Sequence, residues 1–269
     1  MARDKNVLED YEKIWKRWAK KEDRLEVIAQ HRLTRSRFLT LLRHVIKELG
    51  TGACVVELGC GTAIDVGILS KNFPNCLFFA TDLSKNAVKL AKEISLELGS
   101  VFYIFLSDMR NLPFTHNSMD LIFSQGVMEH FEDPTPFFRE QIRALKHSGY
   151  LVVNVPQKYT GYTLYKHRQM KKGLWKLGWE TEYSYFALKK IVCGLGLTEA
   201  SHLGDDYWKS WGEPIFIVRD LGNKILRNFH FKPLNLFLLP AKLYNIMWQF
   251  VENHWGHLFM KNLIVVFKK

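Results

Sequence analysis

Short apolar runs alternate with amphipathic stretches along most of the chain, a pattern typical of a largely parallel sheet with helices on both faces. The runs that fit strands are residues 54–59, 76–82, 101–108, 119–126, 150–156 and 261–269. The stretches that fit helices are residues 63–73, 84–99, 133–149 and 183–196. In the second of these, Ser84 can cap the first turn and Gly99 can end the last one. The pattern predicts an α/β fold with a doubly wound sheet.

The run VVELGCGTA, residues 55–63, predicts a strand that leads into a tight turn. Gly59 and Gly61 lie in this turn, and glycine adopts backbone conformations that a Cβ atom disfavours. Such a turn brings the main chain close to a ligand, so it is the first candidate binding element.

Acidic residues lie at the ends of the first three predicted strands: Glu57, Asp82 and Asp108. In an open α/β sheet, ligands bind beyond the carboxyl ends of the strands, near the point where the strand order reverses. Asp82 follows Gly61 by 21 residues, which suits a carboxylate that accepts both ribose hydroxyls of a nucleoside cofactor. The simplest interpretation is a cofactor with an adenosine group.

The turn does not match two common nucleotide motifs. The dinucleotide fingerprint needs a third glycine or alanine where this chain has Ile64, and no Gly-Lys-Ser/Thr run follows for a P-loop. An acid beside the turn also repels a phosphate, whereas it attracts a ligand with ammonium and sulfonium charge. These features favour a cationic cofactor.

Five motifs, in order, resemble class I S-adenosylmethionine-dependent methyltransferases. They are VVELGCGTA at 55–63, ATDLS at 80–84, SDMRNLPF at 107–114, SMDLIFSQGVMEHFEDP at 118–134 and ALKHSGYLVVNVP at 144–156. The chain is most similar to the small-molecule subgroup, methyltransferase type 11, which includes ubiquinone and menaquinone biosynthesis methyltransferases and likewise has a Glu-His pair after the fourth strand. The resemblance implies a Rossmann-like sheet of seven strands, mostly parallel with an antiparallel C-terminal strand, and S-adenosylmethionine as the cofactor.

The resemblance also implies cofactor contacts, position by position. Around the methionine part it implies Glu57, Gly59, Gly61 and Gln125; at the ribose, Asp82; and at the adenine, Leu83, Asp108 and Met109. Alternatives stay open, because Asp82 and Asp108 can cap turns and Met109 can be a core residue. Ala63 replaces a glycine that is usual in the family, and we expect tighter packing there with cofactor binding retained.

Methyl transfer from a sulfonium depends mainly on alignment, which can contribute roughly 7–11 kcal/mol, and needs a base only when the acceptor must lose a proton. His130, beside Glu129, is the candidate catalytic base, because it follows the fourth strand and a neutral imidazole can accept a proton near neutral pH. The alternative is that His130 lines the pocket or caps the next helix.

Two aromatic-rich regions are candidates for acceptor recognition. Tyr11, Trp15 and Trp18 recur at helical spacing and predict a lid helix over the cofactor, with core packing as the alternative. The insertion at 162–184 is the predicted acceptor pocket, with a purely structural cover as the alternative. Its candidate substrate-binding residues, together with the tyrosine that precedes it, are Tyr159, Tyr162, Tyr165, His167, Trp179 and Glu180.

These assignments divide the chain into four parts. Residues 1–50 are a predicted helical lid, 51–156 the S-adenosylmethionine-binding core, 157–182 a substrate-lid insertion, and 183–269 the rest of the core with a second insertion at 205–257. The stretch 231–259 mixes apolar residues and tryptophans with Pro240 and Lys242, so it cannot span a bilayer. A packed lid helix is the main interpretation, and an interfacial helix on the inner face of the membrane is the alternative.

The distribution of charge along the chain is more informative than the net charge. Lys and Arg outnumber Asp and Glu by 13 to 8 over residues 1–50 and by 17 to 8 over 151–269, but are outnumbered 8 to 11 between them. The basic ends can attract nucleic acid or lipid, yet a solvated surface explains them as well, and no nucleic-acid-binding module is recognisable. The functional interpretations are a small-molecule methyltransferase, a cofactor-binding but catalytically idle partner protein, and, more weakly, an RNA methyltransferase.

The remaining composition indicates a cytoplasmic protein. The charged N-terminal run lacks the apolar segment of a secretory signal, and the four cysteines have no metal-like or disulfide-like spacing. Glu252, His254 and His257 resemble a metal cluster only faintly, and helix-end hydrogen bonding explains them better. We therefore predict no structural metal.

Overall fold

The computed structural model describes residues 2–19, 28, 36–175, 180–205, 255–258 and 260–269. In this part of the chain, seven strands form one sheet in the order β3-β2-β1-β4-β5-β7-β6. Their bounds are β1 Cys54–Leu58, β2 Leu77–Asp82, β3 Tyr103–Leu106, β4 Met119–Gln125, β5 Leu145–Pro156, β6 Thr198–Asp205 and β7 Asn262–Lys268. β7 runs antiparallel to both β5 and β6, and the pairs among β1 to β5 are parallel. The predicted mixed α/β sheet is confirmed.

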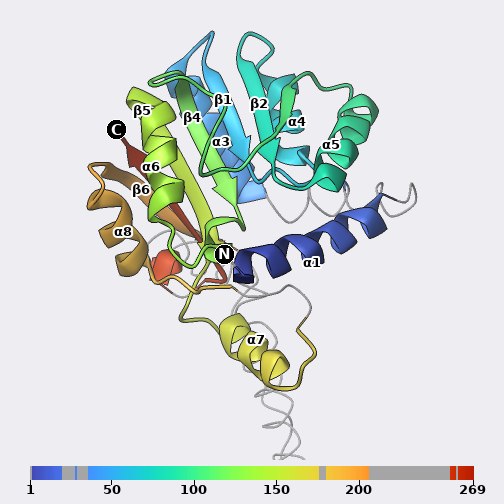
Figure 1. Cartoon of the computed structure of the whole chain (residues 1–269). Helices are drawn as coiled ribbons and strands as arrows, with labels where there is room; N and C mark the ends of the chain where they lie inside the picture. The colour runs from blue at the N-terminus through green and yellow to red at the C-terminus, as the bar shows by residue number, and fades with distance from the viewer. Residues whose placement is uncertain (1, 20–27, 29–35, 176–179, 206–254, 259) are drawn as a thin grey trace, which may run out of the picture.

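Helices lie on both sides of this sheet (Figure 1). Their bounds are α1 Ala2–Trp18, α3 Ser36–Leu49, α4 Ile64–Asn72, α5 Lys85–Leu98, α6 Thr135–Ala144, α7 Gly161–Lys171 and α8 Tyr185–Cys193, with a 3₁₀ turn, η1, at Met128–His130. One core cluster joins α6 and α8 to one face of the sheet, and a second joins α3, α4 and α5 to the other.

Alternate residues of the central strands point into the two clusters. On β1, Val56 and Leu58 belong to the cluster with α6 and α8, whereas Val55 belongs to the cluster with α3 and α4. All three side chains are fully buried. Both faces of the strand are therefore apolar, which is why a near-continuous hydrophobic run, rather than a half-polar one, encodes it.

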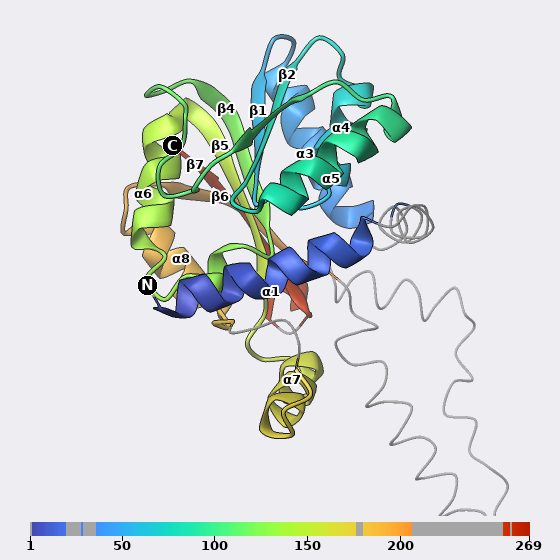
Figure 2. The same ribbon diagram turned by 45° about the vertical axis from the view of Figure 1, so that its right-hand side comes forward.

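The strand order reverses between β1 and β4, which pair side by side although β2 and β3 lie between them in sequence. Figures 1 and 2 show α1 crossing the carboxyl edge of the sheet next to this point, with α7 farther from the sheet. The region that the sheet topology favours for a ligand is thus bordered by the N-terminal helix.

The region predicted as an N-terminal lid, residues 1–50, contains two different kinds of helix. Helix α3 belongs to the core, because Phe38, Leu42 and Ile46 are buried against the sheet. Helix α1 is the part that lies over the carboxyl edge (Figure 2). The second insertion predicted at 205–257 falls largely outside the described residues.

The predicted helix 133–149 is wrong at its end. Helix α6 stops at Ala144, and Leu145 turns to an extended conformation to pair with Met119 of β4. The pairing then resumes at Tyr150 with a register shift, and Ser148 has a positive φ of 67° within the irregular part. Pairing with a central strand therefore ends a helical pattern that the sequence would allow to continue.

Strand β6 and helix α7 were not located from the sequence. Strand β6 is at the edge of the sheet and carries polar residues, and α7 has no apolar stripe of helical period. The predicted strand 101–108 is shorter as observed, at Tyr103–Leu106. Both caps predicted for the helix at 84–99 are confirmed: Ser84 accepts a hydrogen bond from the Ala87 N–H, and Gly99 has the left-handed conformation.

We predict that Ser84→Ala lowers the free energy of unfolding by about 1 kcal/mol, because it removes the side-chain acceptor of a buried helix N-terminus. Urea unfolding of both proteins measures the difference. Ser184→Ala is the comparison, since Ser184 caps α8 through a longer bond, 3.3 Å against 3.0 Å, and should cost less. A Ser84→Ala protein as stable as the wild type would contradict the capping role.

Candidate functional site

The turn after β1 is built from left-handed residues. Gly59, Gly61 and Ala63 all have positive φ, at 63°, 51° and 53°. A Cβ on Gly59 would lie 2.5 Å from Val127, and one on Gly61 would lie 2.5 Å from the Trp15 ring. These close approaches explain both glycines. Ala63 carries a Cβ in a conformation that glycine adopts more readily, which is a mild strain, and it is buried in the core cluster of α3 and α4.

Asp82, the last residue of β2, holds this turn from the neighbouring strand. One carboxylate oxygen accepts from the Gly61 N–H and the other from the Ser84 N–H, each at 2.8 Å. Burial raises the pKa of Asp82 from its usual value, although these two hydrogen bonds oppose the shift. A carboxylate has about four lone-pair sites, so this one can also accept from a ribose hydroxyl without breaking these bonds.

Glu57 lies inside β1 and supports the helix that follows the turn. Its Oε2 accepts from the Val66 N–H at 3.0 Å. Ala63, at the cap position of α4, provides no side-chain acceptor, so Glu57 satisfies a donor that would otherwise lack a partner. The sequence assigned Glu57 to cofactor binding alone, and this structural role was missed.

Helix α1 is fixed over the turn by three side chains. Trp15 lies against Gly61 and packs with the cluster of Ile64 and Leu90 from α4 and α5. Glu12 accepts from the Lys85 N–H at 3.0 Å and from the Asn86 side chain, at the N-terminus of α5. The predicted lid helix therefore covers the same turn that Asp82 holds.

The third side chain, Tyr11, connects α1 to the segment after β4. Its hydroxyl lies 3.0 Å from Nε2 of His130, and the two rings meet edge to face with centroids 5.2 Å apart. Burial raises the pKa of Tyr11 well above its usual range, and the carboxyls of Glu129 and Glu180 add to this shift. The hydroxyl therefore stays protonated and can donate to an unprotonated His130. Sequence reasoning named Tyr11 only as part of a helical face.

Glu129 is the most unusual acid of the site. Its side chain is 2% exposed, and among the described residues no hydrogen-bond partner reaches its Oε2. Burial raises its pKa from 4.5 to about 8. The sequence named Glu129 only as the neighbour of His130, and nothing in a single Glu-His pair could reveal that its carboxyl is buried.

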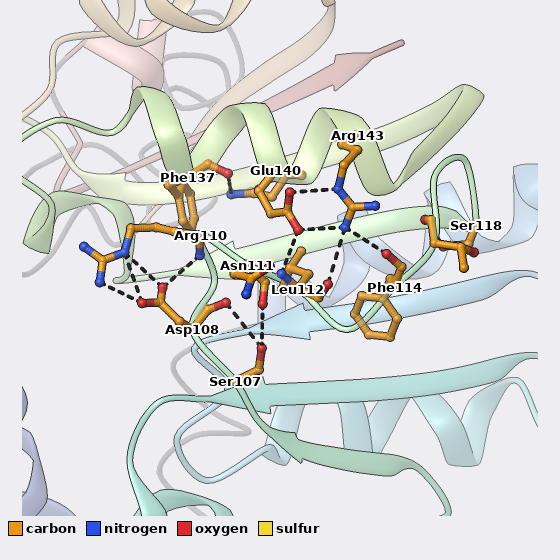
Figure 3. Close-up of polar contacts among 12 residues, drawn as sticks. Ser107, Asp108, Arg110, Asn111, Leu112, Phe114, Ser118, Phe137, Glu140 and Arg143 are labelled. Carbon is orange, nitrogen blue, oxygen red and sulfur yellow. Dashed lines mark hydrogen bonds and ion pairs between the residues drawn. The ribbon is translucent and has the colours of Figure 1, made fainter.

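The loop after β3 carries Asp108, which is labelled in Figure 3, and the next residue in the chain is Met109. The Asp108 carboxylate accepts from Arg110 through the main-chain N–H and the guanidinium, at 2.7 to 3.2 Å. Burial would raise the pKa of Asp108, but these bonds from Arg110 outweigh it and lower the pKa. Met109 is buried in the core cluster beside Val127. Arg110 is a partner that the sequence interpretation of Asp108 did not include.

The same loop is anchored to α6 by hydrogen bonds to an ion pair within that helix (Figure 3). Glu140 accepts from the Leu112 N–H at 2.7 Å, and Arg143 donates to the Phe114 carbonyl at 2.8 Å while pairing with Glu140. The loop that holds Asp108 is thus fixed at its far end.

The two other residues assigned to the cofactor border the same edge. Leu83 directly follows Asp82 and is partly exposed, and Gln125 ends β4 beside Asn154 of β5. The structure therefore brings the predicted cofactor residues to the carboxyl ends of β1, β2, β3 and β4.

The predicted acceptor residues divide into two groups. Tyr162 and Glu180 belong to a cluster near Tyr11, since all three interact electrostatically. Tyr159, Tyr165 and His167 are exposed, and His167 pairs with Glu182 at 2.9 Å. Trp179 lies outside the described residues.

Lys166 is a residue of this region that the sequence analysis did not select. Its side chain is 1% exposed and lies between Glu180 at 3.1 Å and Glu182 at 2.6 Å. Lysine is rarely buried this far unless paired. A lysine among several in a basic insertion gives no sequence signal of its burial.

The predictions about metal ligands, membrane-spanning helices and cysteines concern residues that the structure describes in part. Within the described ranges, no group of three or more His, Cys, Asp or Glu residues has an arrangement that could hold a metal ion. Glu252 and His254 are not among the described residues, and His257 lies against His202, with ring centroids 4.0 Å apart. No helix in the described part of the chain is long and apolar enough to cross a membrane. All four cysteines are free thiols.

The arrangement suits a cationic nucleoside cofactor. Buried acids lie at the strand ends, the glycine turn has no room for side chains, and an aromatic helix covers it. Asp82 can accept from ribose, and the carboxylates favour positive charge. The residues present thus fit S-adenosylmethionine.

Comparison with known proteins gives the same result. Residues 56–153 match the family model described as a methyltransferase domain. The chain is 31% identical over 98 residues to a malonyl-[acyl-carrier protein] O-methyltransferase of Hahella chejuensis, covering 36% of this chain and 34% of that protein. It is 28% identical over 158 residues to a demethylmenaquinone methyltransferase of Staphylococcus aureus, covering 56% and 62%. The chain thus spans about a third of the length of the first curated relatives that it matches.

Solved structures support the fold over nearly the whole chain. A Thermotoga maritima S-adenosylmethionine-dependent methyltransferase, described as a possible histamine N-methyltransferase, aligns with a TM-score of 0.60 at 16% identity, covering 95% of this chain and 98% of that one. The magnesium protoporphyrin IX methyltransferase of Synechocystis aligns with a TM-score of 0.59 at 13% identity, covering 97% and 99%.

The resemblance seen in the sequence is thus confirmed over residues 56–153, which match the methyltransferase-domain model, and the fold of the chain is shared with solved S-adenosylmethionine-dependent methyltransferases.

Proposed function

We propose that the chain is an enzyme that binds S-adenosylmethionine and transfers its methyl group to an oxygen, nitrogen or carbon atom of a small, partly hydrophobic molecule. The observation that carries this proposal is the position of Asp82. Its buried carboxylate joins the Gly61 turn to the start of α5, at the carboxyl edge of the sheet beneath α1. The small acceptors named for similar proteins, a malonyl group on a carrier protein and a demethylmenaquinone, support an acceptor other than nucleic acid.

Each residue of the site has a proposed role in binding. Asp82 accepts from the ribose hydroxyls, while Glu57, Gly59, Gly61 and Gln125 surround the methionine part. Leu83, Asp108 and Met109 border the adenine. When bound, S-adenosylmethionine supplies a methyl group on a sulfonium. Trp15 and the rest of α1 exclude water from this crevice, and the exclusion strengthens each charge interaction inside it.

His130 is the proposed base where the acceptor must lose a proton. Because the Tyr11 hydroxyl lies 3.0 Å from Nε2, Tyr11 can give its proton to His130 while taking one from the acceptor. The relay returns Tyr11 to its neutral form, consistent with the raised pKa of that hydroxyl. Two half-buried residues of different elements would thus act together.

The first test is calorimetric titration with S-adenosylmethionine and S-adenosylhomocysteine, with NAD as the negative control. We expect the first two to bind and NAD not to bind. Asp82→Ala should weaken binding about tenfold or more, because a charged acceptor of two hydroxyl donors is lost. Asp120→Ala is the matched control, since Asp120 bonds the Cys54 N–H at the opposite edge of the sheet. Unchanged affinity in Asp82→Ala would overturn the assigned site.

A second test separates catalysis from binding. A panel of small metabolites is screened for release of S-adenosylhomocysteine, and the best acceptor is then tested with the variants. His130→Asn should lower turnover by about a hundredfold or more while leaving the affinity for S-adenosylmethionine unchanged. Tyr11→Phe should also lower turnover.

The alternatives have distinct outcomes in these tests. A protein that binds the cofactor but releases no S-adenosylhomocysteine with any acceptor would be a catalytically idle partner. Methylation of RNA, with affinity that falls steeply as salt rises, would instead identify a nucleic-acid acceptor. Full turnover by His130→Asn would mean that alignment alone performs the transfer.

A further inference from the structure

A buried cluster of charged residues lies beyond the cofactor edge, on the side of α7. Lys166 of α7 pairs with Glu180 and Glu182 from the segment that precedes α8. The Thr181 N–H, between these two acids, donates to the main-chain carbonyl of Glu129 at 2.8 Å. The acceptor-side insertion is therefore tied directly to the segment that carries Glu129 and His130.

One oxygen of the Glu129 carboxyl is unsatisfied, although the main chain of Glu129 and Val127 hydrogen-bonds this carboxyl. No described residue hydrogen-bonds its Oε2, and its Oε1 lies 3.6 Å from where a Gly126 Cβ would be. A buried polar atom without a partner costs free energy, so such an atom in a native site points to a ligand that completes it. Gly126 follows directly after β4, at the carboxyl edge where the strand order reverses.

The charges of this cluster do not balance. Three carboxyls, those of Glu129, Glu180 and Glu182, lie around one buried ammonium, that of Lys166. The Lys261 ammonium lies 4.5 Å from the centre of the Tyr162 ring. Lys166 is already shared by two of the acids, which leaves it no free charge for an anionic acceptor. The region around these carboxyls is thus locally acidic, although the chain has a net charge of +11.

Aromatic rings border the same carboxyl. Tyr11 interacts electrostatically with both Glu129 and Tyr162, and its hydroxyl lies 3.0 Å from Nε2 of His130. Tyr162 in turn packs edge to face with Trp175, with centroids 6.3 Å apart. Aromatic faces next to a carboxyl attract a cation with an apolar body.

We propose that Glu129 and Tyr11 form the acceptor subsite, and that the methyl acceptor is a small amine that enters as an ammonium ion with its apolar part against Tyr11 and Tyr162. This inference rests on the proposed methyltransferase function and names its substrate class. The Glu129 carboxylate pairs with the ammonium, and the Tyr11–His130 relay takes one N–H proton. The lone pair that this frees on nitrogen forms the new N–CH₃ bond, while the former S–CH₃ pair stays on sulfur in the neutral thioether.

Loss of the ammonium proton also removes the charge repulsion between the acceptor and the sulfonium. An ammonium and a sulfonium repel each other, whereas a neutral amine does not. Glu129 first binds the ammonium, and the Tyr11–His130 relay then removes its proton. The amine is therefore neutral when it approaches the sulfonium.

The test measures binding of matched small molecules to the protein saturated with S-adenosylhomocysteine. The probes are hexylamine, phenethylamine and tryptamine, each beside the alcohol and the carboxylate of the same skeleton. We expect at least one amine to bind about tenfold or more tightly than both of its analogues, and Glu129→Gln to remove this preference. Glu132→Gln, an exposed acid of the same segment, is the matched control and should keep it.

The outcomes separate this inference from the function on which it rests. If S-adenosylhomocysteine itself fails to bind, the methyltransferase proposal fails. If it binds to wild type and to Glu129→Gln alike, but no amine is preferred or the preference survives the substitution, only the amine assignment is overturned. Retained cofactor binding also shows that Glu129→Gln is folded.

The pH dependence of amine binding is an independent readout. The groups that face Glu129 are Glu180, Lys166, Tyr11 and Tyr183, with Glu182 behind Lys166. Because Glu129 has a pKa of about 8, it must lose its proton to pair with an ammonium. Amine affinity should therefore rise as the pH approaches about 8 in the wild type and stay flat over that range in Glu129→Gln. Equal profiles would overturn the pairing.

The free energy of unfolding should also depend on the Glu129 carboxyl, and it should fall as the pH rises. The folded state holds the Glu129 proton up to about pH 8, whereas the ordinary value in an unfolded chain is 4.5. The contribution of this group is thus fully present below 4.5 and is lost as the pH rises toward about 8. Urea unfolding over this range should show a decline in the wild type that Glu129→Gln lacks, and identical slopes would contradict the buried carboxyl.

Discussion

The carboxylate of Asp82 is the interaction on which the candidate site depends. It bonds the Gly61 N–H after β1 and the Ser84 N–H after β2, while its own main-chain carbonyl accepts from the Ser107 N–H after β3. The ends of three strands are thus fixed through one buried residue. Burial of a carboxylate is costly, and here two backbone donors offset part of that cost. A glycine turn without this anchor would be free to adopt many conformations, and a precise binding edge requires one.

Helix α1 depends on the same edge. Trp15 contacts Gly61, Glu12 caps the start of α5, and Tyr11 reaches His130. The first two contacts lie over the glycine turn and the start of α5, and the third lies at the segment after β4. One helix therefore covers both parts of the carboxyl edge, and a cover that removes water strengthens the charge interactions beneath it.

Charge distinguishes the site from the rest of the molecule. The chain as a whole is strongly basic, yet Glu57, Asp82 and Glu129 are all buried at the carboxyl edge. Two of these acids have backbone partners that explain their burial, because Glu57 bonds the Val66 N–H and Asp82 bonds two N–H groups. Glu129 differs, since one oxygen lacks a partner among the described residues. Backbone hydrogen bonds thus offset part of the cost of burying the first two acids, and the unpartnered oxygen of Glu129 is the one that we propose a ligand completes.

The sequence by itself determined the fold class, the glycine turn and the acids at the strand ends. Those features are local, because apolar runs mark buried strands and turn residues mark their ends. Gly61 was therefore recognised as a turn residue, and Asp82, 21 residues later, as an acid at a strand end. It could not determine that Glu57 caps α4, that Arg110 pairs with Asp108, or that α6 ends at Ala144 because Leu145 joins the sheet. Only the tertiary structure decided that Tyr11 meets His130, 119 residues away, and that Glu129 and Lys166 are buried. Burial and long-range pairing are properties of the packed chain, and a glutamate or a lysine has the same letter whether it is solvated or enclosed.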